Sequence, residues 1–344
     1  MRVFCVGSAL VLGLVLNHAQ EKPSQRYTEQ VEVERVLVDV RVLDSEGRPV
    51  EGLDADDFSV KIGGKPVPID SAMWVGGATS NEEVVAAETG ARAPVTDDGR
   101  PGRLIIFLFQ KDLEPSRLTG LMRMLIESQS FIDNLTPRDR VAVLSFDSQL
   151  KIWLDFTNDR EAIRQVLRRR ILFGDPEPLV PSMTPSLVSR LDSATASKTY
   201  TIEKALHSIA DAVRGLPGSK SIVFVGHGFG RLGWTGVSME HGYEDAREAL
   251  LAARTSVFSL DVTKADYHSL EVGLQMVSRE TGGFFARTHM FPAQAMNRLA
   301  GVLAGYYVLF LEQPQVRPGT HGIDVRLTKQ QGTVLARESY VRQK

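Results

Sequence analysis

The sequence predicts a Rossmann-like α/β fold, with a doubly wound, mainly parallel sheet flanked by N- and C-terminal β segments. First, apolar strand-like runs alternate with helical patterns across residues 103–304. Such alternation is typical of right-handed crossovers with helices on both faces of a parallel sheet. Second, residues 28–75 and 305–344 carry β patterns. Each end alone has too few strands to bury a face, so we expect both to form one β-sandwich, with two independent β modules as the alternative.

The two β-patterned ends differ in amino-acid composition from residues 76–102, which follow the first of them. In the N-terminal β module, residues 28–75, Gly63 and Gly64 are suited to a tight hairpin. Residues 76–102 contain no aromatic side chain and are rich in Gly, Ala, Thr and Pro, so we expect a flexible linker. The strands expected in the two ends are 31–42, 58–62, 67–75, 306–311, 321–327 and 333–341.

Within residues 103–304 the elements follow one another in regular order. Residues 104–109 are continuously apolar, which is typical of a parallel strand covered on both faces. Pro115 begins a helix whose apolar positions repeat at helical spacing. Asn158 and Asp159 are expected to cap a helix that runs to Arg170. The remaining expected elements are strands 141–146, 150–156 (an antiparallel edge), 221–225, 256–260 and 284–287, and helices 201–213, 244–254, 270–280 and 292–303.

Residues 1–19 have the layout of a secretory signal peptide. Arg2 supplies a positive charge, residues 3–16 are apolar, and Ala19 is a small residue suited to cleavage. The apolar run is shorter than the roughly 20 residues that span a bilayer. We expect an exported protein, periplasmic, cell-surface or secreted, without a membrane span after cleavage; an uncleaved anchor is the alternative. Cys5 is the only cysteine, so the mature chain is expected to rely on its core rather than on disulfides.

Charge and motif spacing exclude two classes of ligand. The chain has 40 Lys and Arg against 42 Asp and Glu, a net charge of −2, so no basic field exists for non-specific binding of nucleic acid. A dinucleotide site needs glycines after the first parallel strand, where backbone N–H groups approach phosphate. Residues 110–114 contain no glycine there and include the carboxylates of Asp112 and Glu114, which repel phosphate.

Polar residues follow the expected parallel strands, where open α/β sheets bind their ligands. In sequence order these are Gln110 to Glu114, Asp147, Thr199, His227 and Asp261. A hydrolase would need a nucleophile such as Ser145 with His227 and Asp261 as partners, but no Gly-x-Ser-x-Gly elbow occurs. Because these residue types are present but the motif is absent, a hydrolase is kept only as an alternative interpretation.

Several segments together resemble a known family. Residues 103–156 combine an apolar strand, an amphipathic helix, the run TPRDRVAV at 136–143 and Ser-Phe-Asp at 145–147, and this combination resembles a von Willebrand factor A domain. The segments that resemble the acidobacterial VWFA-related exported proteins are 38–42, 47–53, 57–60, 281–283 and 305–309. The resemblance covers nearly the whole mature chain. It implies a signal peptide at 1–19, an A-type domain at 103–304, and a C-terminal β segment at 305–344 packed with 28–75.

The resemblance also implies where a divalent cation would bind. A-domains that hold Mg²⁺ carry Asp-x-Ser-x-Ser after the first strand, a later Thr, and an Asp after the fourth strand. This chain has Gln110, Asp112 and Glu114 in the first motif, or Asp112, Glu114 and Ser116 in a shifted register. Thr199 fits the threonine position, and His227 replaces the last Asp. The implied set Asp112, Glu114, Ser116, Thr199 and His227 is therefore a degenerate metal site.

The sequence thus favours a non-enzymatic adhesion or scaffold protein. No cofactor is expected, because Mg²⁺ accepts imidazole poorly. A metal-dependent binder is the alternative, and His227 would then favour Zn²⁺ or Mn²⁺ over Mg²⁺. Trp234 lies in a long glycine-rich loop and is expected to be an exposed contact. The residues expected to bind a protein partner of the cell envelope or extracellular space are Gln110, Asp112, Glu114, Thr199, His227 and Trp234.

Overall fold

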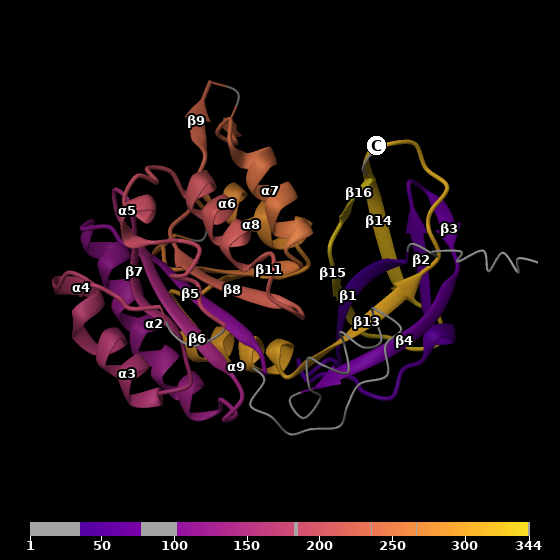
Figure 1. Cartoon of the computed structure of the whole chain (residues 1–344), viewed down its shortest axis with the longest axis horizontal. Helices are drawn as coiled ribbons and strands as arrows, with labels where there is room; N and C mark the ends of the chain where they lie inside the picture. The colour runs from indigo at the N-terminus through magenta and orange to yellow at the C-terminus, as the bar shows by residue number, and fades with distance from the viewer. Residues whose placement is uncertain (1–34, 77–101, 182–184, 235, 266, 343–344) are drawn as a thin grey trace, which may run out of the picture. The chain divides into compact units, whose positions relative to one another are not determined.

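The computed structural model describes residues 35–76, 102–181, 185–234, 236–265 and 267–342 (Figure 1). The expected signal peptide, the first part of the expected strand 31–42 and nearly all of the expected linker lie outside the described residues. The described residues belong to one unit, Glu34–Lys344. Within them, no helix combines the length and the apolar character that a membrane crossing requires.

A mixed six-stranded sheet forms the centre of the α/β domain, as predicted. Its spatial order is β12-β11-β8-β5-β6-β7, with every neighbouring pair parallel except β6 and β7. If these six strands are numbered 1 to 6 along the chain and read from the β7 edge, their order is 3-2-1-4-5-6, that of a doubly wound sheet. The order of the strands reverses between β5 and β8. The antiparallel edge strand β7 was also predicted. The strands are β5 (Leu104–Gln110), β6 (Arg140–Phe146), β7 (Leu150–Thr157), β8 (Lys220–Gly226), β11 (Thr255–Asp261) and β12 (Phe285–Arg287).

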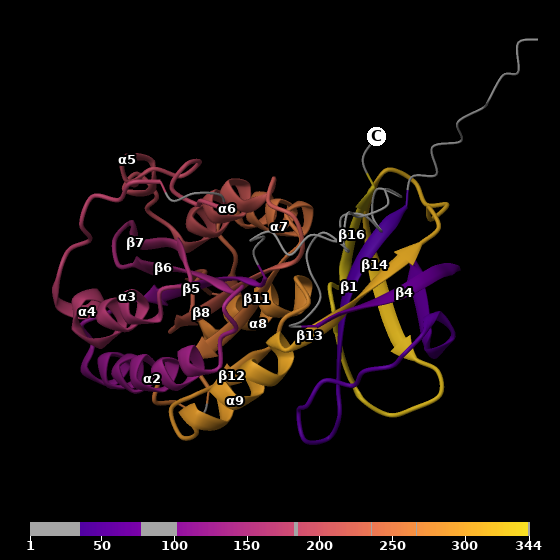
Figure 2. The same cartoon turned by 60° about the horizontal axis from the view of Figure 1, so that its bottom comes forward.

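Helices cover both faces of this sheet, because its strands are apolar on both sides. Alternate residues of β5 contribute to two separate apolar clusters, Ile106 to one and Phe107 to the other. Figure 2 shows α6 and α7 on one side of the sheet and α2 and α9 on the other. The described helices are α2 (Pro115–Asp133), α3 (Arg160–Gln165), α4 (Ile171–Phe173), α5 (Ser193–Ala196), α6 (Ile202–Val213), α7 (Tyr243–Ala252), α8 (Glu271–Glu280) and α9 (Pro292–Leu303).

One helix differs from its expected form. The Asp159 side chain caps α3, as predicted, by accepting the backbone N–H groups of Glu161 and Ala162. The α-helical pattern then changes to a π-helical stretch, Val166–Arg170, before α4 continues to Phe173. The predicted end at Arg170 was therefore wrong by three residues. Val166, Leu167 and Ile171 are all buried, so packing continues across the π-helical stretch.

Strands from the two chain ends pair with one another in two four-stranded sheets. The first has the order β15-β1-β13-β4 and the second β16-β14-β2-β3. Val38 and Val40 of one sheet and Val60 of the other belong to one apolar cluster. The expected strand 333–341 is divided into β15 and β16, which join different sheets. The strands are β1 (Val36–Leu43), β2 (Phe58–Ile62), β3 (Lys65–Val67), β4 (Ile69–Gly76), β13 (Gly305–Leu311), β14 (Gly319–Leu327), β15 (Thr333–Ala336) and β16 (Ser339–Arg342).

Candidate functional site

The parallel register brings the ends of three strands to one edge of the sheet. Phe109 of β5 lies opposite Val225 of β8, and Val225 lies opposite Leu260 of β11. The carboxyl ends of β5, β8 and β11 therefore lie side by side. We call the described residues of the loops after β5, β8, β11 and β12 the carboxyl rim; they are residues 111–114, 227–234, 236–242, 262–265, 267–270 and 288–291.

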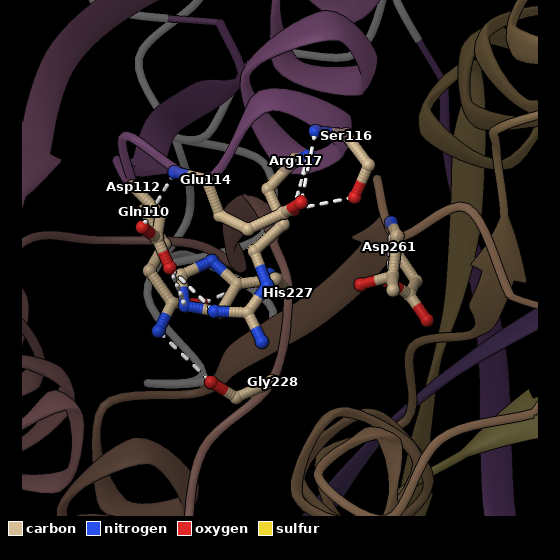
Figure 3. A network of polar contacts seen from close by, with 9 residues as sticks. Gln110, Asp112, Glu114, Ser116, Arg117, His227, Gly228 and Asp261 are labelled. Atoms are coloured by element: carbon tan, nitrogen blue, oxygen red, sulfur yellow. Dashed lines mark hydrogen bonds and ion pairs between the residues drawn. The ribbon is translucent and has the colours of Figure 1, made fainter.

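Gln110 joins the two strands at which the strand order reverses. Its buried side chain donates from Nε2 to the carbonyl of Gly228 at 2.8 Å, and its Oε1 accepts the N–H of His227 at 3.0 Å (Figure 3). Both ends of the amide are thus hydrogen-bonded to the loop after β8. Gln110 consequently holds β5 and β8 together at the position where an open α/β sheet has its crevice.

Asp112, Arg117 and His227 form a polar contact at the start of α2 (Figure 3). A carboxylate oxygen of Asp112 pairs with the Arg117 guanidinium, and His227 Nε2 lies 3.6 Å from the same oxygen. The other oxygen of Asp112 accepts the Glu114 N–H at 3.0 Å. Partial burial opposes ionisation of Asp112, but the hydrogen bonds from the Glu114 N–H and Arg117 outweigh it and lower the pKa. Asp112 is therefore an ionised carboxylate with a cationic partner.

Glu114 and Ser116 serve the N-terminus of α2. The Glu114 carboxylate accepts the backbone N–H groups of Ser116 and Arg117 and the Ser116 hydroxyl. These bonds satisfy N–H groups that a helix start leaves without intrahelical partners. The hydrogen bond from the Ser116 side chain is the largest cause that lowers the pKa of Glu114. Helix capping thus accounts for this Glu-x-Ser pair.

These residues do not fit the divalent cation that the family pattern implies. The amide of Gln110 is occupied by backbone groups, and Glu114 caps α2. Arg117 pairs with Asp112, so a positive side chain already balances the carboxylate that a cation would need. A second cation beside it would be repelled. The arrangement instead forms an internal polar contact among Asp112, Arg117 and His227.

His227 is a neutral imidazole in this environment. Burial, followed by repulsion from Arg117, lowers the pKa of His227 to about 4, although Asp112 acts in the opposite direction. The contact with Asp112 is therefore not an ion pair at neutral pH. The Nδ1 atom of His227 is buried and has no hydrogen-bond partner in the described part of the chain.

Thr199 lies before α6 rather than at its start. The cap of α6 is Thr201, whose side chain accepts the Lys204 N–H, so the helix begins at Ile202. Thr199 is buried, and its carbonyl accepts the N–H of Leu150 at 3.3 Å. Among the described residues, no hydrogen bond joins its hydroxyl to Asp112 or His227. The structure therefore does not bring Thr199 into the polar contact described above.

Strand β11, which neighbours β8 in the sheet, leads to a polar cluster that sequence analysis found only in part. Asp261 ends β11 and is fully buried; its Oδ1 accepts the Thr263 N–H at 2.9 Å, and its Oδ2 lies 2.8 Å from His268 Nε2. Glu271 begins α8 and is 1% exposed. The ligand-type atoms of Asp261, His268 and Glu271 lie within 4.8 Å of one another. His268 and Glu271 were missed, although the His-x-x-Glu spacing next to a strand-end Asp was available in the sequence.

Ser145 does not assemble with His227 and Asp261. Its side chain is fully buried, and its Oγ accepts a hydrogen bond from Trp153 Nε1 at 2.8 Å. Asp261 contacts His268 instead of His227. The Ser-His-Asp arrangement that the hydrolase alternative requires is therefore not formed by these three residues.

Large apolar side chains are exposed on the carboxyl rim. The Trp234 side chain is fully exposed. It directly follows β9 (Arg231–Gly233), which forms a hairpin with β10 (Gly236–Ser238). Figure 1 shows β9 projecting beyond the helices near it. The other exposed large apolar residues of the rim are Leu113, Leu232, Tyr267, Met290 and Phe291.

Comparison with known proteins finds likeness among solved structures only. No protein-family profile and no curated protein matches the sequence. A von Willebrand factor type A protein from Catenulispora acidiphila is similar with a TM-score of 0.42 and 9% identity, over 87% of this chain and 74% of that one. Proximal thread matrix protein 1 of the mussel byssus is similar with a TM-score of 0.40 and 12% identity, over 60% of this chain. This chain spans 48% of the mussel protein, about half its length.

A further similar structure comes from Bacteroides fragilis. It is an aerotolerance-related membrane protein with a TM-score of 0.37 and 13% identity, and the match covers 59% of this chain and 98% of that one.

Proposed function

We propose that this protein is exported and binds a protein of the cell envelope or extracellular space through its carboxyl rim, as a non-enzymatic adhesion or scaffold protein. The observation that carries the proposal is the gathering of exposed apolar side chains on this rim. Six of the eleven exposed large apolar residues in the described part of the chain lie in its loops. Single exposed apolar residues are common, whereas a group on one face is typical of an interaction surface.

The composition of this group supports a protein partner. Trp234 and Tyr267 are of the residue types that contribute most to protein–protein interfaces. Leu232 precedes Trp234 on the same hairpin and is exposed as well. A fully exposed Trp has a large apolar area that only a partner surface can bury. We infer that the hairpin inserts Trp234 into an apolar depression of the partner.

The base of the rim is held in place by hydrogen bonds. Gln110 links β5 to the loop after β8, and the Thr288 N–H and hydroxyl both donate to the Asp261 carbonyl at 2.8 Å. Loops that are already ordered lose less conformational entropy on binding. A rigid base with apolar side chains at its tips is suited to binding without a chemical step.

Export is proposed from the N-terminal sequence. Arg2, the apolar residues 3–16 and the small residue Ala19 form the pattern of a cleavable signal. Expression of the full chain in a bacterial host, followed by N-terminal sequencing of the extracytoplasmic fraction, tests this. A mature N-terminus close to residue 20 supports export, and an intact cytoplasmic chain contradicts it.

The binding proposal is tested by capture of envelope proteins with the purified mature chain. We expect Trp234→Ala to abolish capture of a defined partner band, because the anchor side chain is lost. Phe173→Ala is a matched control, since Phe173 is an equally apolar, exposed residue of α4 outside the rim. Capture that survives Trp234→Ala and Leu113→Ala, or that Phe173→Ala abolishes to the same extent, contradicts the proposal.

A further inference from the structure

We propose that Asp261, His268 and Glu271 form a Zn²⁺ site at the carboxyl rim, separate from the Asp112 position. Their three ligand-type atoms lie within 4.8 Å of one another. Asp261 closes β11 and Glu271 opens α8, so both carboxylates are fixed by regular elements. His268 comes from the loop between them, three residues before Glu271.

The donor set matches zinc in chemistry and in size. Zn²⁺ takes imidazole nitrogen and carboxylate oxygen at about 2.0–2.2 Å, so two ligand atoms of a tetrahedral site lie roughly 3.3–3.5 Å apart. The His268 Nε2 and Asp261 Oδ2 atoms are 2.8 Å apart. Small side-chain shifts would bring all three donors to that spacing. An imidazole ligand disfavours Mg²⁺ and Ca²⁺, which prefer oxygen donors only.

Hydrogen bonds already hold both carboxylates in position. Arg287 donates to Glu271 from Nε at 3.0 Å and from a terminal nitrogen at 2.6 Å, and Gln275 Nε2 donates to it at 2.9 Å. The Thr263 N–H donates to Asp261. Such outer contacts orient metal ligands in known sites and leave a lone pair on each oxygen for the metal.

Charge balance also favours a cation at this position. Asp261 and Glu271 are 0% and 1% exposed, and burying two carboxylates is costly unless positive charge accompanies them. Arg287 pairs with Glu271 as Arg117 pairs with Asp112, but this cluster has a second carboxylate: the ion-pair contact of Asp261 in the described residues is with His268, not with an arginine or lysine. A divalent cation between Asp261 and His268 would place positive charge directly beside the buried Asp261 carboxylate.

A separate observation concerns the loops that adjoin this cluster. Three buried polar atoms in the adjoining loops have no hydrogen-bond partner in the described part of the chain: His227 Nδ1, Thr263 Oγ1 and His289 Nδ1. His227 is 9% exposed and interacts electrostatically with His268. Buried polar atoms are rarely left unsatisfied, and an ion or the water on it is one of the usual reasons. Thr263 donates its N–H to Asp261, so a water bound to zinc at Asp261 would offer a partner to the unsatisfied Thr263 hydroxyl.

Bound zinc would fix the loop between β11 and α8. That loop carries Tyr267, which is exposed on the carboxyl rim. A metal that ties the first and last residues of the loop together reduces its freedom, as a crosslink does. The site is accordingly structural, and it does not depend on the binding function proposed above.

The test uses the full mature chain, freed of metal by a chelator and then titrated with zinc sulfate. Calorimetry is expected to show one site, and the thermal unfolding temperature is expected to rise with zinc concentration, because zinc binds only the folded state. Magnesium and calcium at the same concentrations should cause neither change. X-ray absorption of the zinc-loaded protein should show a single imidazole among oxygen ligands.

Variants locate the site. We expect His268→Gln, which keeps side-chain size and a hydrogen-bonding group, to abolish the zinc-dependent shift while circular dichroism shows the same fold. Arg287→Ala should weaken zinc binding by about 10- to 100-fold, because it orients Glu271. His207→Ala is the matched control, since His207 is partly exposed on α6 and contacts only Asp211 among the ion pairs of the described residues. Zinc binding that is unchanged in His268→Gln, or that Asp112→Asn abolishes instead, overturns the proposal, as does the absence of any zinc-dependent heat.

Discussion

The guanidinium of Arg117 pairs with the carboxylate of Asp112 where β5 leads into α2. Because of this contact, the positive charge beside Asp112 comes from the protein itself and not from a bound cation. The sequence resemblance led us to expect a cation held by carboxylate and hydroxyl oxygens, whereas a side chain of the protein supplies the positive charge at Asp112. His227, 3.6 Å from the same carboxylate, stays neutral beside it. The rim therefore has a permanent internal cation at the Asp112 position.

Removal of Arg117 should raise the pKa of His227. Burial is the largest cause that depresses this pKa to about 4, and repulsion from Arg117 is the second. In Arg117→Met the repulsion is absent while the burial and the attraction of Asp112 remain. We expect the NMR titration midpoint of His227 to move upward but to stay below the usual 6.5. A midpoint that is unchanged or lower than in the wild type would contradict this assignment of the causes.

Stability should fall as the pH decreases from about 6.5 to about 4. The folded pKa of His227 is about 4, whereas the unfolded chain has the ordinary value of 6.5. Between these values the unfolded state binds a proton that the folded state does not, so the free energy of unfolding increases with pH across this window. The difference corresponds to about 3 kcal/mol at most.

Urea denaturation at several pH values measures this effect. His227→Gln should show a smaller pH dependence between pH 4 and 6.5, because glutamine does not titrate. His241→Gln, at an exposed position in the loop before α7, should keep the wild-type dependence. Identical slopes for wild type and His227→Gln would show that His227 does not contribute.

Apolar pattern was enough to predict the central sheet. All seven residues of β5 are buried, and its continuous apolar sequence indicated a parallel strand covered on both faces. The helix boundaries were less predictable. The π-helical stretch Val166–Arg170 depends on a shift in backbone hydrogen bonding that apolar periodicity does not record. The division of residues 333–341 into two strands depends on which sheet each half joins, which is decided by tertiary pairing.

The position of the candidate site could be predicted from the sequence, but the contacts among its side chains could not. The rule that ligands bind beyond the carboxyl ends of parallel strands led to Gln110, Asp112, His227 and Asp261. The arginine partner of Asp112 and the histidine partner of Asp261 could not be predicted, because pairing depends on side-chain direction. Arg117 lies in the first turn of α2, directly after Ser116, and its side chain turns back to Asp112. Glu114 looked like a ligand, but its spacing from Ser116 equally describes a helix cap.

Asp139 should be essential for the stability of the α/β domain. It is buried, accepts the Arg103 Nε at 2.8 Å and the Thr136 N–H at 2.7 Å, and pairs with the Arg103 guanidinium, which also donates to the Leu303 carbonyl. Asp139→Ala leaves the guanidinium and the N–H group without this partner, and we expect a loss of about 3 kcal/mol or more in the free energy of unfolding. Chemical denaturation measures it.

A matched pair of controls separates this effect from charge removal in general. Glu46→Ala breaks an exposed ion pair with Arg48 and should change stability by less than about 1 kcal/mol. Arg103→Met combined with Asp139→Ala should recover part of the loss, because the unpaired, partly buried cation is then gone. Equal effects of Asp139→Ala and Glu46→Ala would mean that burial of Asp139 is not important.

Gln110→Asp introduces the acidic residue that A-domains with bound Mg²⁺ carry in this motif, and it should destabilise the protein without creating magnesium binding. The shorter carboxylate cannot donate to the Gly228 carbonyl, which loses its 2.8 Å hydrogen bond, and it brings negative charge towards that oxygen. Loss of a buried hydrogen bond with an unsatisfied partner costs about 1–3 kcal/mol.

Arg117 remains beside Asp112 in this variant and still repels a cation. Magnesium titration by calorimetry should therefore be silent in Gln110→Asp, and only the addition of Arg117→Ser would remove the competing charge. Magnesium binding by Gln110→Asp alone would show that Arg117 is not what excludes the cation.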